Sequence, residues 1–415
     1  MSQPDSKPLL LFITRDAPSE RGGNGVTVYN HDVLANLAAH GFDVHVLLLE
    51  PYLLRGRLPW VKAQASGSPF KALHPGYVKI GGRFWHLKGI LCFLRNQLSR
   101  WFKFVNPMPP LAATTWGNEL TPEEKTWVQA VRLQKKWDVV ICNYCWLADS
   151  LTCFEPQTKK AVLTHDVWHQ HLYRKSDNLH MQALNRYKEA AYLNLADIVI
   201  AITQRDGDVF KEMVKTKKII VAPMSCSPRF NDKPPKPGRL FFVGSGYIAN
   251  VDGVNWFLNE VAPVLESKKP GCFEFHVAGL VGDALVGNRN GIKVVKKGIV
   301  VDLDIEYAQA QIVLIPLLGG TGLKIKLVEA IGHGKAIITT RAGAQGVESL
   351  EGRSFVLAES AEEFARAILE ISENDEKRFA LELGARESAI NIFSPDACYR
   401  QLVSELKQKD NLRDN

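Results

Sequence analysis

Lys326 and Glu329 stand three residues apart behind a glycine-rich segment, Gly319–Leu323, in the second half of the sequence. The apolar run before this segment predicts a strand, and the pattern after it predicts a helix that ends near Gly334. Glycines let a ligand approach the backbone closely, and the free N–H groups at a helix start attract anions. One face of the expected helix carries Gly322, Lys326, Glu329 and His333.

These residue types have the chemistry that a nucleotide requires. A lysine neutralises phosphate, and an ionised glutamate accepts hydrogen bonds from ribose hydroxyls. The apolar residues of the same helix fall on another face, so core packing need not bury Lys326 or Glu329. An ordinary Lys–Glu pair on a solvated helix surface explains the spacing equally well. The residues alone therefore leave a nucleotide site and a surface ion pair as alternatives.

The overall composition is typical of a soluble, cytoplasmic protein with two or three domains. The chain has 415 residues, and no apolar run is long enough to span a bilayer. The apolar stretch near the N-terminus is too short for a signal peptide. The seven cysteines are scattered, which favours a reducing compartment without disulfides. Cys142 and Cys145 form a C-x-x-C pair in an apolar strand without a second pair, so we expect neither zinc nor redox chemistry there.

The net charge of +7 comes from one segment of the chain. Residues 51–118 contain ten lysines and arginines and no acidic residue, whereas the other residues carry 41 basic and 44 acidic side chains. Such local basicity indicates an anionic surface as the partner. The aromatic residues of the segment stand among long aliphatic ones, unlike the stacking surfaces that bind nucleic acid, so we expect no nucleic-acid partner.

Within this basic segment, residues 86–104 have the pattern of an amphipathic helix. The apolar positions are Leu87, Ile90, Leu91, Leu94, Leu98, Trp101 and Phe102, and the basic positions opposite them are Lys88, Arg95 and Lys103. A helix of this kind lies in the plane of an anionic membrane, which would place the protein peripherally at the inner face of the plasma membrane. A helix that packs its apolar face against its own domain is the alternative.

Apolar strands alternate with helical patterns along both halves of the chain, which indicates a doubly wound α/β fold. The first half predicts strands at 9–14, 44–49, 139–142, 161–164 and 198–202, with helices over 26–39 and 184–195. The second half predicts strands at 240–243, 273–278, 312–315 and 336–339, with a helix over 250–265. We therefore predict domains at 1–222 and 238–392, a linker rich in proline and lysine at 223–237, and a C-terminal helix within 393–415 that returns to the first domain.

Several stretches of the sequence resemble the GT-B glycosyltransferases, in particular the retaining family 4 group, or glycosyl transferases group 1. They are "RGGNGVTVYNHDVLANL", "LTHDVWHQ", "LADIVIAITQRD", "FFVGSGYIANVDGVNWFLNEVAPVL" and "IPLLGGTGLKIKLVEAIGHGKAIITT", and they cover most of the chain apart from about residues 51–120. The resemblance implies two facing Rossmann-like domains. It also implies that the protein transfers a sugar, as a hexosyltransferase does, from a nucleotide-sugar donor to a hydroxyl of a glycan or lipid-linked acceptor. Anomeric configuration would be retained, without a metal or another cofactor, in the synthesis of a polysaccharide or glycolipid.

The same resemblance implies roles for individual residues. The catalytic residues would be His165, Lys326 and Glu329. Glu329 would bind the donor ribose, and His165 would lie near the donor sugar; from the sequence alone, a capping or core histidine is the alternative. The other residues at the donor would be Gly23, Gly244, Gly298, Val300, Gly319, Gly320, Thr321, Gly322, Leu323 and Lys324. Of these, Gly298 and Val300 would contact the base.

Two departures from the family pattern concern the donor. Many members have a second glutamate eight residues before the ribose glutamate, where this chain has Thr321, so backbone N–H groups or the hydroxyl would hold the sugar. Many members also have an arginine and a lysine after the first strand of this domain, where Gly244–Gly253 has neither. A helix start supplies only about half a charge, which is too little for a diphosphate. Lys324 or Lys326 must then supply the cation, and Lys326 is favoured because it shares a face with Glu329.

Two other functions compete with glycosyl transfer. Because of the two departures, a degenerate, non-catalytic protein that binds a nucleotide-sugar stays an alternative. A dinucleotide oxidoreductase is suggested by Gly244–Ala249, which fits G-x-G-x-x-A after a strand. That fingerprint also requires an acidic residue at the end of the next strand, and the stretch "CFEFHVAGLVG" ends without one. The sequence does not specify the sugar, the base, the acceptor or the linkage.

Overall fold

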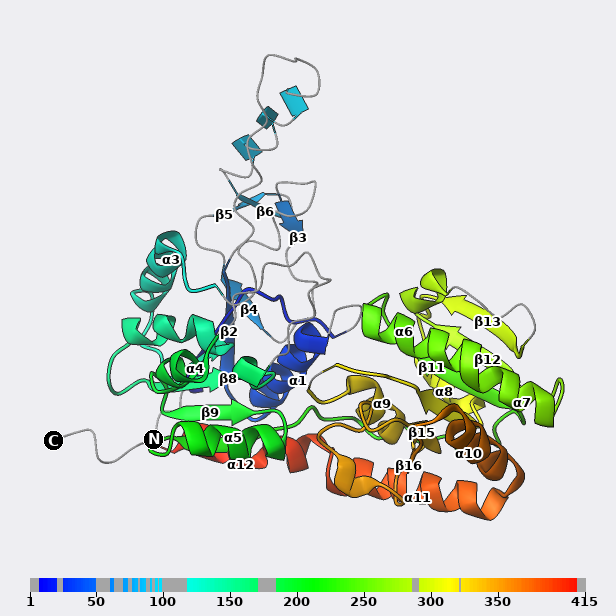
Figure 1. Cartoon of the computed structure of the whole chain (residues 1–415). Helices are drawn as coiled ribbons and strands as arrows, with labels where there is room; N and C mark the ends of the chain where they lie inside the picture. The colour runs from blue at the N-terminus through cyan, green and yellow to red at the C-terminus, as the bar shows by residue number, and fades with distance from the viewer. Residues whose placement is uncertain are drawn as a thin grey trace, which may run out of the picture. The chain divides into compact units, whose positions relative to one another are not determined.

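The protein consists of two compact units. The first is made of Met1–Val221 with Gln401–Asn415, and the second of Ala222–Arg400. The computed structural model describes residues 7–20, 25–49, 60–62, 70–73, 77–80, 83–86, 90–91, 94–95, 97–98, 118–170, 184–285, 291–320 and 322–408. Figure 1 shows that each unit has its own sheet with helices packed on it.

Among the described residues, the main sheet of the first unit has seven strands, and every neighbouring pair is parallel. The strand order is β4-β2-β1-β7-β8-β9-β10. The strands are β1 (Leu9–Thr14), β2 (Asp43–Leu48), β4 (Lys71–Leu73), β7 (Val139–Asn143), β8 (Lys159–Leu163), β9 (Ile198–Ala201) and β10 (Lys218–Val221). The order reverses between β1 and β7, and ligands in such sheets bind beyond the carboxyl ends of the strands at this point.

Helices cover this sheet because its strands are apolar on both faces. They are α1 (Gly25–Ala39), α3 (Pro122–Arg132), α4 (Arg186–Leu193) and α5 (Gln204–Met213), with 3-10 turns η1 (Cys145–Cys153) and η2 (Trp168–Gln170). Leu11, Ile13 and Val140 share a core with Trp127 of α3 and Phe210 of α5. The helices predicted at 26–39 and 184–195 correspond to α1 and α4.

A second, antiparallel sheet in the first unit lies within the basic segment 51–118. Its strands β3 (Trp60–Lys62), β6 (Arg83–His86) and β5 (Tyr77–Ile80) pair in that order. The prediction of a helix from residue 86 is therefore wrong at its start, because His86 is paired in β6. Ile90, Leu91, Leu94, Arg95, Gln97 and Leu98 are helical, whereas Trp101 and Phe102 lie outside the described residues.

In the part of the second unit that the structure describes, the sheet has six strands in the order β13-β12-β11-β14-β15-β16, and all neighbouring pairs are parallel. The strands are β11 (Arg239–Val243), β12 (Glu274–Ala278), β13 (Lys293–Gly298), β14 (Ile312–Ile315), β15 (Ile337–Thr339) and β16 (Val356–Leu357). The order reverses between β11 and β14. Each strand predicted for the two main sheets is present, and together the two sheets confirm the predicted doubly wound α/β fold.

The helices of the second unit pack on alternate residues of its strands. They are α6 (Ile248–Trp256), α7 (Ala262–Lys268), α8 (Leu303–Gln309), α9 (Ile325–Gly332), α10 (Ala361–Glu373) and α11 (Asp375–Asn391), with short turns η3 (Phe257–Val261), η4 (Leu280–Ala284) and η5 (Glu348–Leu350). On one face, Phe275 packs with Phe257 and Phe364 of α10, and on the other Phe241 packs against Tyr307 of α8. The predicted helix 250–265 is spanned by α6, the π-helical turn η3 and α7.

The last helix, α12 (Pro395–Lys407), begins in the second unit and ends in the first. It is drawn in red in Figure 1. Lys159 Nζ of β8 donates to the carbonyl oxygens of Glu405 (2.9 Å) and Gln408 (2.6 Å), and a cation at this position complements the negative end of the helix. Lys218 also pairs with Glu405. Residues 223–237, predicted as a linker, contain no helix or strand and belong to the second unit.

Candidate functional site

The reversal of strand order in the second unit brings two glycine loops together. One follows β11 and contains Gly244 and Gly246, and the other follows β14 and contains Gly319 and Gly320. Helix α6 can approach the end of β14 because Gly253 has no side chain: a Cβ there would lie 2.3 Å from the carbonyl oxygen of Pro316. Both loops therefore lie where nucleotide ligands bind in such sheets.

Lys324 holds the second glycine loop in place. Gly320 and Gly322 have φ angles of 108° and 71°, a conformation that favours glycine. The buried Lys324 Nζ donates to Gly322 O (2.6 Å) and lies 3.4 Å from Gln345 Oε1. The ammonium that the sequence offered as a second phosphate ligand is thus bound to the backbone of its own loop.

Lys326 connects the two glycine loops. It lies in the first turn of α9, and its Nζ donates to Asn250 Oδ1 of α6 at 2.9 Å. Asn250 Nδ2 in turn donates to Ser245 O at 3.0 Å, in the loop after β11. Burial, followed by the positive charge of Lys324, lowers the pKa of Lys326 to about 8. Lys326 therefore places a cation beside the loop after β11, which has no arginine or lysine of its own.

Glu329 lies about one turn further along the same face of α9. Burial raises the pKa of this carboxyl group, and Tyr307, Arg229 and Lys326 act in the opposite direction. Tyr307 is fully buried, and its ring stacks on His333 with centroids 4.1 Å apart. The carboxylate is thus partly buried among aromatic rings and cations, as a hydrogen-bond acceptor for a ligand would be.

Apolar side chains surround these polar groups at the carboxyl edge of the sheet. Gly298 ends β13, and the side chain of the next residue, Ile299, is 77% exposed. Other exposed apolar residues that follow strands of this sheet are Tyr247, Ile248, Leu280, Val301 and Leu318. Exposed apolar side chains around a few polar groups are typical of small-molecule sites. The sequence pointed to Gly298 and Val300 at this position but not to the apolar rim.

His165 lies in the first unit, just after β8. The side chain is 6% exposed, and burial lowers the pKa of the imidazole to about 4, although Asp166 acts to raise it. Its Nε2 lies 2.7 Å from Asn143 Oδ1 at the end of β7. The ring also packs against Tyr144 at 4.5 Å and against the edge of Tyr29 at 5.4 Å. His165 is therefore neutral at pH 7 and held from several sides.

A buried carboxylate shapes the turn that follows His165. Glu189 of α4 accepts hydrogen bonds from the backbone N–H groups of Trp168 (2.8 Å) and His169 (2.9 Å), and its Oε2 lies 2.7 Å from His169 Nδ1. Neither Glu189 nor Asn143 was predicted as a site residue. A buried carboxylate in the middle of a helical pattern gives no sequence signal, whereas Asn143 directly follows an apolar run at a strand end.

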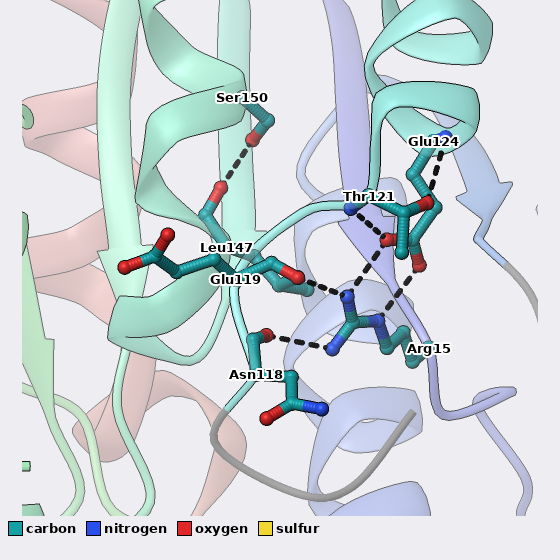
Figure 2. A network of polar contacts seen from close by, with 7 residues as sticks. All are labelled: Arg15, Asn118, Glu119, Thr121, Glu124, Leu147 and Ser150. Atoms are coloured by element: carbon teal, nitrogen blue, oxygen red, sulfur yellow. Dashed lines mark hydrogen bonds and ion pairs between the residues drawn. The ribbon is translucent and has the colours of Figure 1, made fainter. Parts of the chain in front are cut away.

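Arg15 ties the end of the basic segment to the tip of β1 (Figure 2). Its guanidinium donates to both carboxylate oxygens of Glu124 (2.8 and 2.7 Å) and to the carbonyl oxygens of Asn118 and Glu119 (2.9 Å each). Glu124 also accepts from Thr121 N, the N-cap of α3, so the carboxylate that completes this capping box also binds Arg15. Residues 118–119 are thus fixed to the carboxyl edge of the sheet.

The structure brings most predicted donor residues together but does not describe them all. The described ones of the second unit lie at the ends of its strands or in the loops and the helix that follow them: Gly244, Gly298, Val300, Gly319, Gly320, Gly322, Leu323, Lys324, Lys326 and Glu329. His165 belongs to the first unit. Gly23 and Thr321 lie outside the described residues.

Solved structures with this architecture are GT-B proteins. TarM of S. aureus has a TM-score of 0.64 at 10% identity, and the match covers 97% of this chain and 99% of TarM. A glycosyltransferase from Rickettsia africae has a TM-score of 0.63 at 12% identity, with 97% and 98% covered. The pneumococcal O-GlcNAc transferase GtfA, in complex with UDP and GlcNAc, has a TM-score of 0.60 at 13% identity, with 96% and 99% covered. The chain therefore has the GT-B fold.

Sequence comparison adds a family match within the second unit. Residues 237–374 match the family Glycosyl transferases group 1. An uncharacterized 44.6 kDa protein in the cps region of Klebsiella pneumoniae is 22% identical over 294 residues, which cover 66% of this chain and 74% of that protein. The family match and the fold together support a GT-B glycosyltransferase. No helix in the described part of the chain is long and apolar enough to cross a membrane.

Proposed function

We propose that this protein is a retaining glycosyltransferase of family 4 type, which transfers a hexosyl group from a nucleotide-sugar to a hydroxyl of a glycan or lipid-linked acceptor. One observation carries the proposal. Lys326 and Glu329 share a face of α9, and Lys326 bonds to Asn250 between the glycine loops where the strand order reverses. Nucleotides bind at this position in doubly wound sheets. The family match of residues 237–374 agrees with this assignment.

The two charged side chains have separate roles in this proposal. An ammonium has three N–H donors, and within the described chain one of those of Lys326 goes to Asn250, so the others can bind the diphosphate. Glu329 accepts hydrogen bonds from the ribose hydroxyls. The apolar rim around Ile299 packs against the base. Uridine is the first base to test, because several structures with this fold were solved with UDP.

The chemical step follows from the charge that develops on the donor. In a retaining transfer without a covalent intermediate, the acceptor hydroxyl attacks from the side on which the nucleoside diphosphate leaves. The protein then contributes by positioning the reactants and by stabilising the leaving group. Lys326 supplies the stabilising charge in place of the arginine and lysine that many family members have after β11. His165 binds the sugar and needs no metal for this role.

We propose further that the basic segment docks on an anionic membrane. Leu91, Leu94 and Leu98 are spaced for one face of a helix and are 64%, 51% and 49% exposed, so these side chains are not packed in the core of the unit. Ten basic residues and no acidic ones in residues 51–118 complement an anionic surface. Sedimentation with acidic and neutral liposomes tests this proposal: equal pelleting with both would contradict it.

Ligand-dependent stability is the direct test of the function. Thermal unfolding is measured with UDP, GDP and ADP and with their glucose and N-acetylglucosamine conjugates, because a ligand that binds the native state raises the unfolding temperature. Release of the matching nucleoside diphosphate in the presence of acceptor separates an enzyme from a non-catalytic nucleotide-sugar binder. Stabilisation without any release would favour the non-catalytic alternative, and no stabilisation by any compound would contradict both.

A further inference from the structure

Three neighbouring strand ends of the first unit are joined by a chain of hydrogen bonds. Thr14 ends β1, Asn143 ends β7, and His165 follows β8, so the chain begins where the strand order reverses. Asn143 Nδ2 donates to Thr14 Oγ1 at 3.0 Å, and Asn143 Oδ1 lies 2.7 Å from His165 Nε2. Thr14 and Asn143 are fully buried, and His165 nearly so. Water therefore does not compete for these contacts.

The hydroxyl of Thr14 sets the direction of this chain. A hydroxyl has one hydrogen to donate and two lone pairs to accept. Thr14 Oγ1 donates its hydrogen to Asp16 O (3.0 Å) and accepts from Asp16 N (2.9 Å). It can therefore only accept from Asn143, so the NH₂ group of the amide faces Thr14 and its oxygen faces His165. In the opposite orientation the amide oxygen would face Thr14, whose single hydroxyl hydrogen would have to leave Asp16 O to reach it.

We infer that Thr14 and Asn143 are positioning residues that fix His165 as the neutral tautomer with a proton on Nε2, so that Nδ1 accepts a hydrogen bond from a sugar hydroxyl. An oxygen acceptor at 2.7 Å requires a proton on Nε2. A neutral imidazole then has no proton on Nδ1, and within the described chain Nδ1 has no hydrogen-bond partner. The ring nitrogen that remains for a ligand is thus an acceptor, which suits a hydroxyl and repels phosphate oxygens.

The backbone next to this chain of hydrogen bonds is strained, which indicates a functional constraint. Tyr144, which follows Asn143, has a φ angle of 73°, and a bulky residue rarely adopts this left-handed conformation. In this conformation its ring packs on His165 at 4.5 Å and stacks on Trp146 at 4.2 Å. The strained turn thus places the Tyr144 ring against the imidazole, while Asn143 contacts its Nε2. Asp166 is the charged group that acts on His165, and burial keeps the imidazole neutral in spite of it.

The contact between Nδ1 and a sugar hydroxyl rests on the proposed function, because that function supplies the sugar. The rest of the inference does not depend on it. A hydroxyl of the donor sugar and a hydroxyl of the acceptor have the same chemistry toward Nδ1. The tautomer itself is a property of the protein without ligand, so it can be tested even if no sugar transfer is detected.

Long-range proton–nitrogen NMR correlation of deuterated protein with 15N-labelled histidine measures the tautomer directly. The chain has 11 histidines, and the signals of His165 are those lost in His165→Gln. We expect a protonated Nε2 and an unprotonated Nδ1 from pH 5.5 to 8.5, because the imidazole titrates near pH 4. A proton on Nδ1, or a charged ring at pH 7, would overturn the inference.

Two substitutions at Thr14 separate the hydrogen-bond chain from simple packing. Thr14→Val keeps the shape but removes the hydroxyl, and it should give a mixture of His165 tautomers. Thr14→Ser keeps the hydroxyl and should preserve the wild-type tautomer. Circular dichroism confirms that both variants fold. If Thr14→Val kept a single Nε2–H tautomer, Thr14 would have no positioning role; if it did not fold, the wild-type spectrum would still decide the tautomer.

The source of the hydroxyl is tested by adding ligands to the labelled protein. UDP-glucose, UDP-N-acetylglucosamine, UDP alone and a glucose disaccharide are added until other resonances are saturated. A shift of Nδ1 with a sugar nucleotide but not with UDP assigns a donor hydroxyl, and a shift with the disaccharide assigns an acceptor hydroxyl. No shift of Nδ1 with any saturating compound would overturn the hydroxyl contact. Sugar transfer by a protein that lacks the expected tautomer would leave the proposed function intact and contradict only this inference.

Discussion

The strand ends of the two units have similar topology, but Lys326 and Glu329 in the second unit differ in charge from His165 in the first. In the second unit, a lysine and a glutamate lie beside two glycine loops, and both are partly buried ions whose pKa values are shifted. In the first unit, a neutral histidine is held by an amide and packed between aromatic rings. Charge suits the ionic part of a nucleotide-sugar, and a neutral acceptor suits its hydroxyls. The same Rossmann-like scaffold thus presents different chemistry according to which residues follow its strands.

Substitution of Lys326 by methionine should have the largest effect. Under the proposed function, Lys326→Met removes the charge that stabilises the leaving diphosphate, and the loss of one such group costs about 10²–10³-fold in kcat. Affinity for the nucleoside diphosphate should fall less, because the leaving-group charge grows in the transition state. Steady-state release of UDP and calorimetric binding of UDP separate the two effects. Equal losses in both would make Lys326 a binding residue only.

The affinity for UDP should fall at alkaline pH. The pKa of Lys326 is lowered to about 8, so the ammonium is mostly charged at pH 7 and mostly neutral at pH 9. A lysine of this pKa loses about tenfold in its charged fraction over these two pH units, and the dissociation constant of UDP should rise by about that factor. Calorimetry at each pH measures it. Lys326→Met is the control and should remove the dependence; the same slope in both proteins would assign it to another group.

Replacement of His165 should affect turnover and leave nucleotide affinity unchanged. His165→Ala removes the proposed hydrogen bond to a sugar hydroxyl, which is worth about 1 kcal/mol or about fivefold in rate. The variant should bind UDP as the wild type does, because UDP has no transferred sugar. Single-turnover rates and UDP binding provide the two readouts. An unchanged rate in a folded variant would make His165 a structural residue of the aromatic cluster.

A single basic residue of the membrane segment should have the smallest effect. Arg95→Gln removes one charge, which is worth about 1 kcal/mol near an anionic surface, so binding to acidic liposomes should weaken about fivefold. Lys211→Gln on α5 removes an exposed charge outside the segment and serves as the matched control. Equal weakening by both substitutions would indicate a general charge effect and contradict docking through this segment.

The centres of both sheets could be predicted from the sequence, but their edges could not. Central strands such as β1 and β14 are continuous apolar runs, because parallel strands are buried on both faces. The edge strands β4, β10, β13 and β16 were not predicted. β13 reads KVVKKG and β16 has two residues, so neither has a pattern that differs from a loop. The strand β6 could not be predicted for the same reason, since its pairing partners and not its composition define it.

The arrangement of Lys326 and Glu329 could be predicted from the sequence better than the surroundings of His165. Lys326 and Glu329 are close in sequence and on one helix, so their spacing alone showed that they share a face. The preference for Lys326 over Lys324 agrees with the contacts, since Lys324 bonds to its own loop. The chain from Thr14 to His165 joins residues 129 and 22 positions apart, and only the order of the strands brings them together. No local pattern carries that information.

The central claim is that Glu329 binds the ribose of a nucleoside diphosphate, and calorimetry with Glu329→Gln tests it most directly. A hydrogen bond to a charged acceptor is worth about 1.5–3 kcal/mol, so the affinity for the preferred diphosphate among UDP, GDP and ADP should fall about tenfold or more. Glu376→Gln on α11 removes an exposed carboxylate and should leave the affinity unchanged. If Glu329→Gln bound every diphosphate as tightly as the wild type, Glu329 would be an ordinary ion-pair partner of Lys326, and the assignment of this site to a nucleotide-sugar would be wrong.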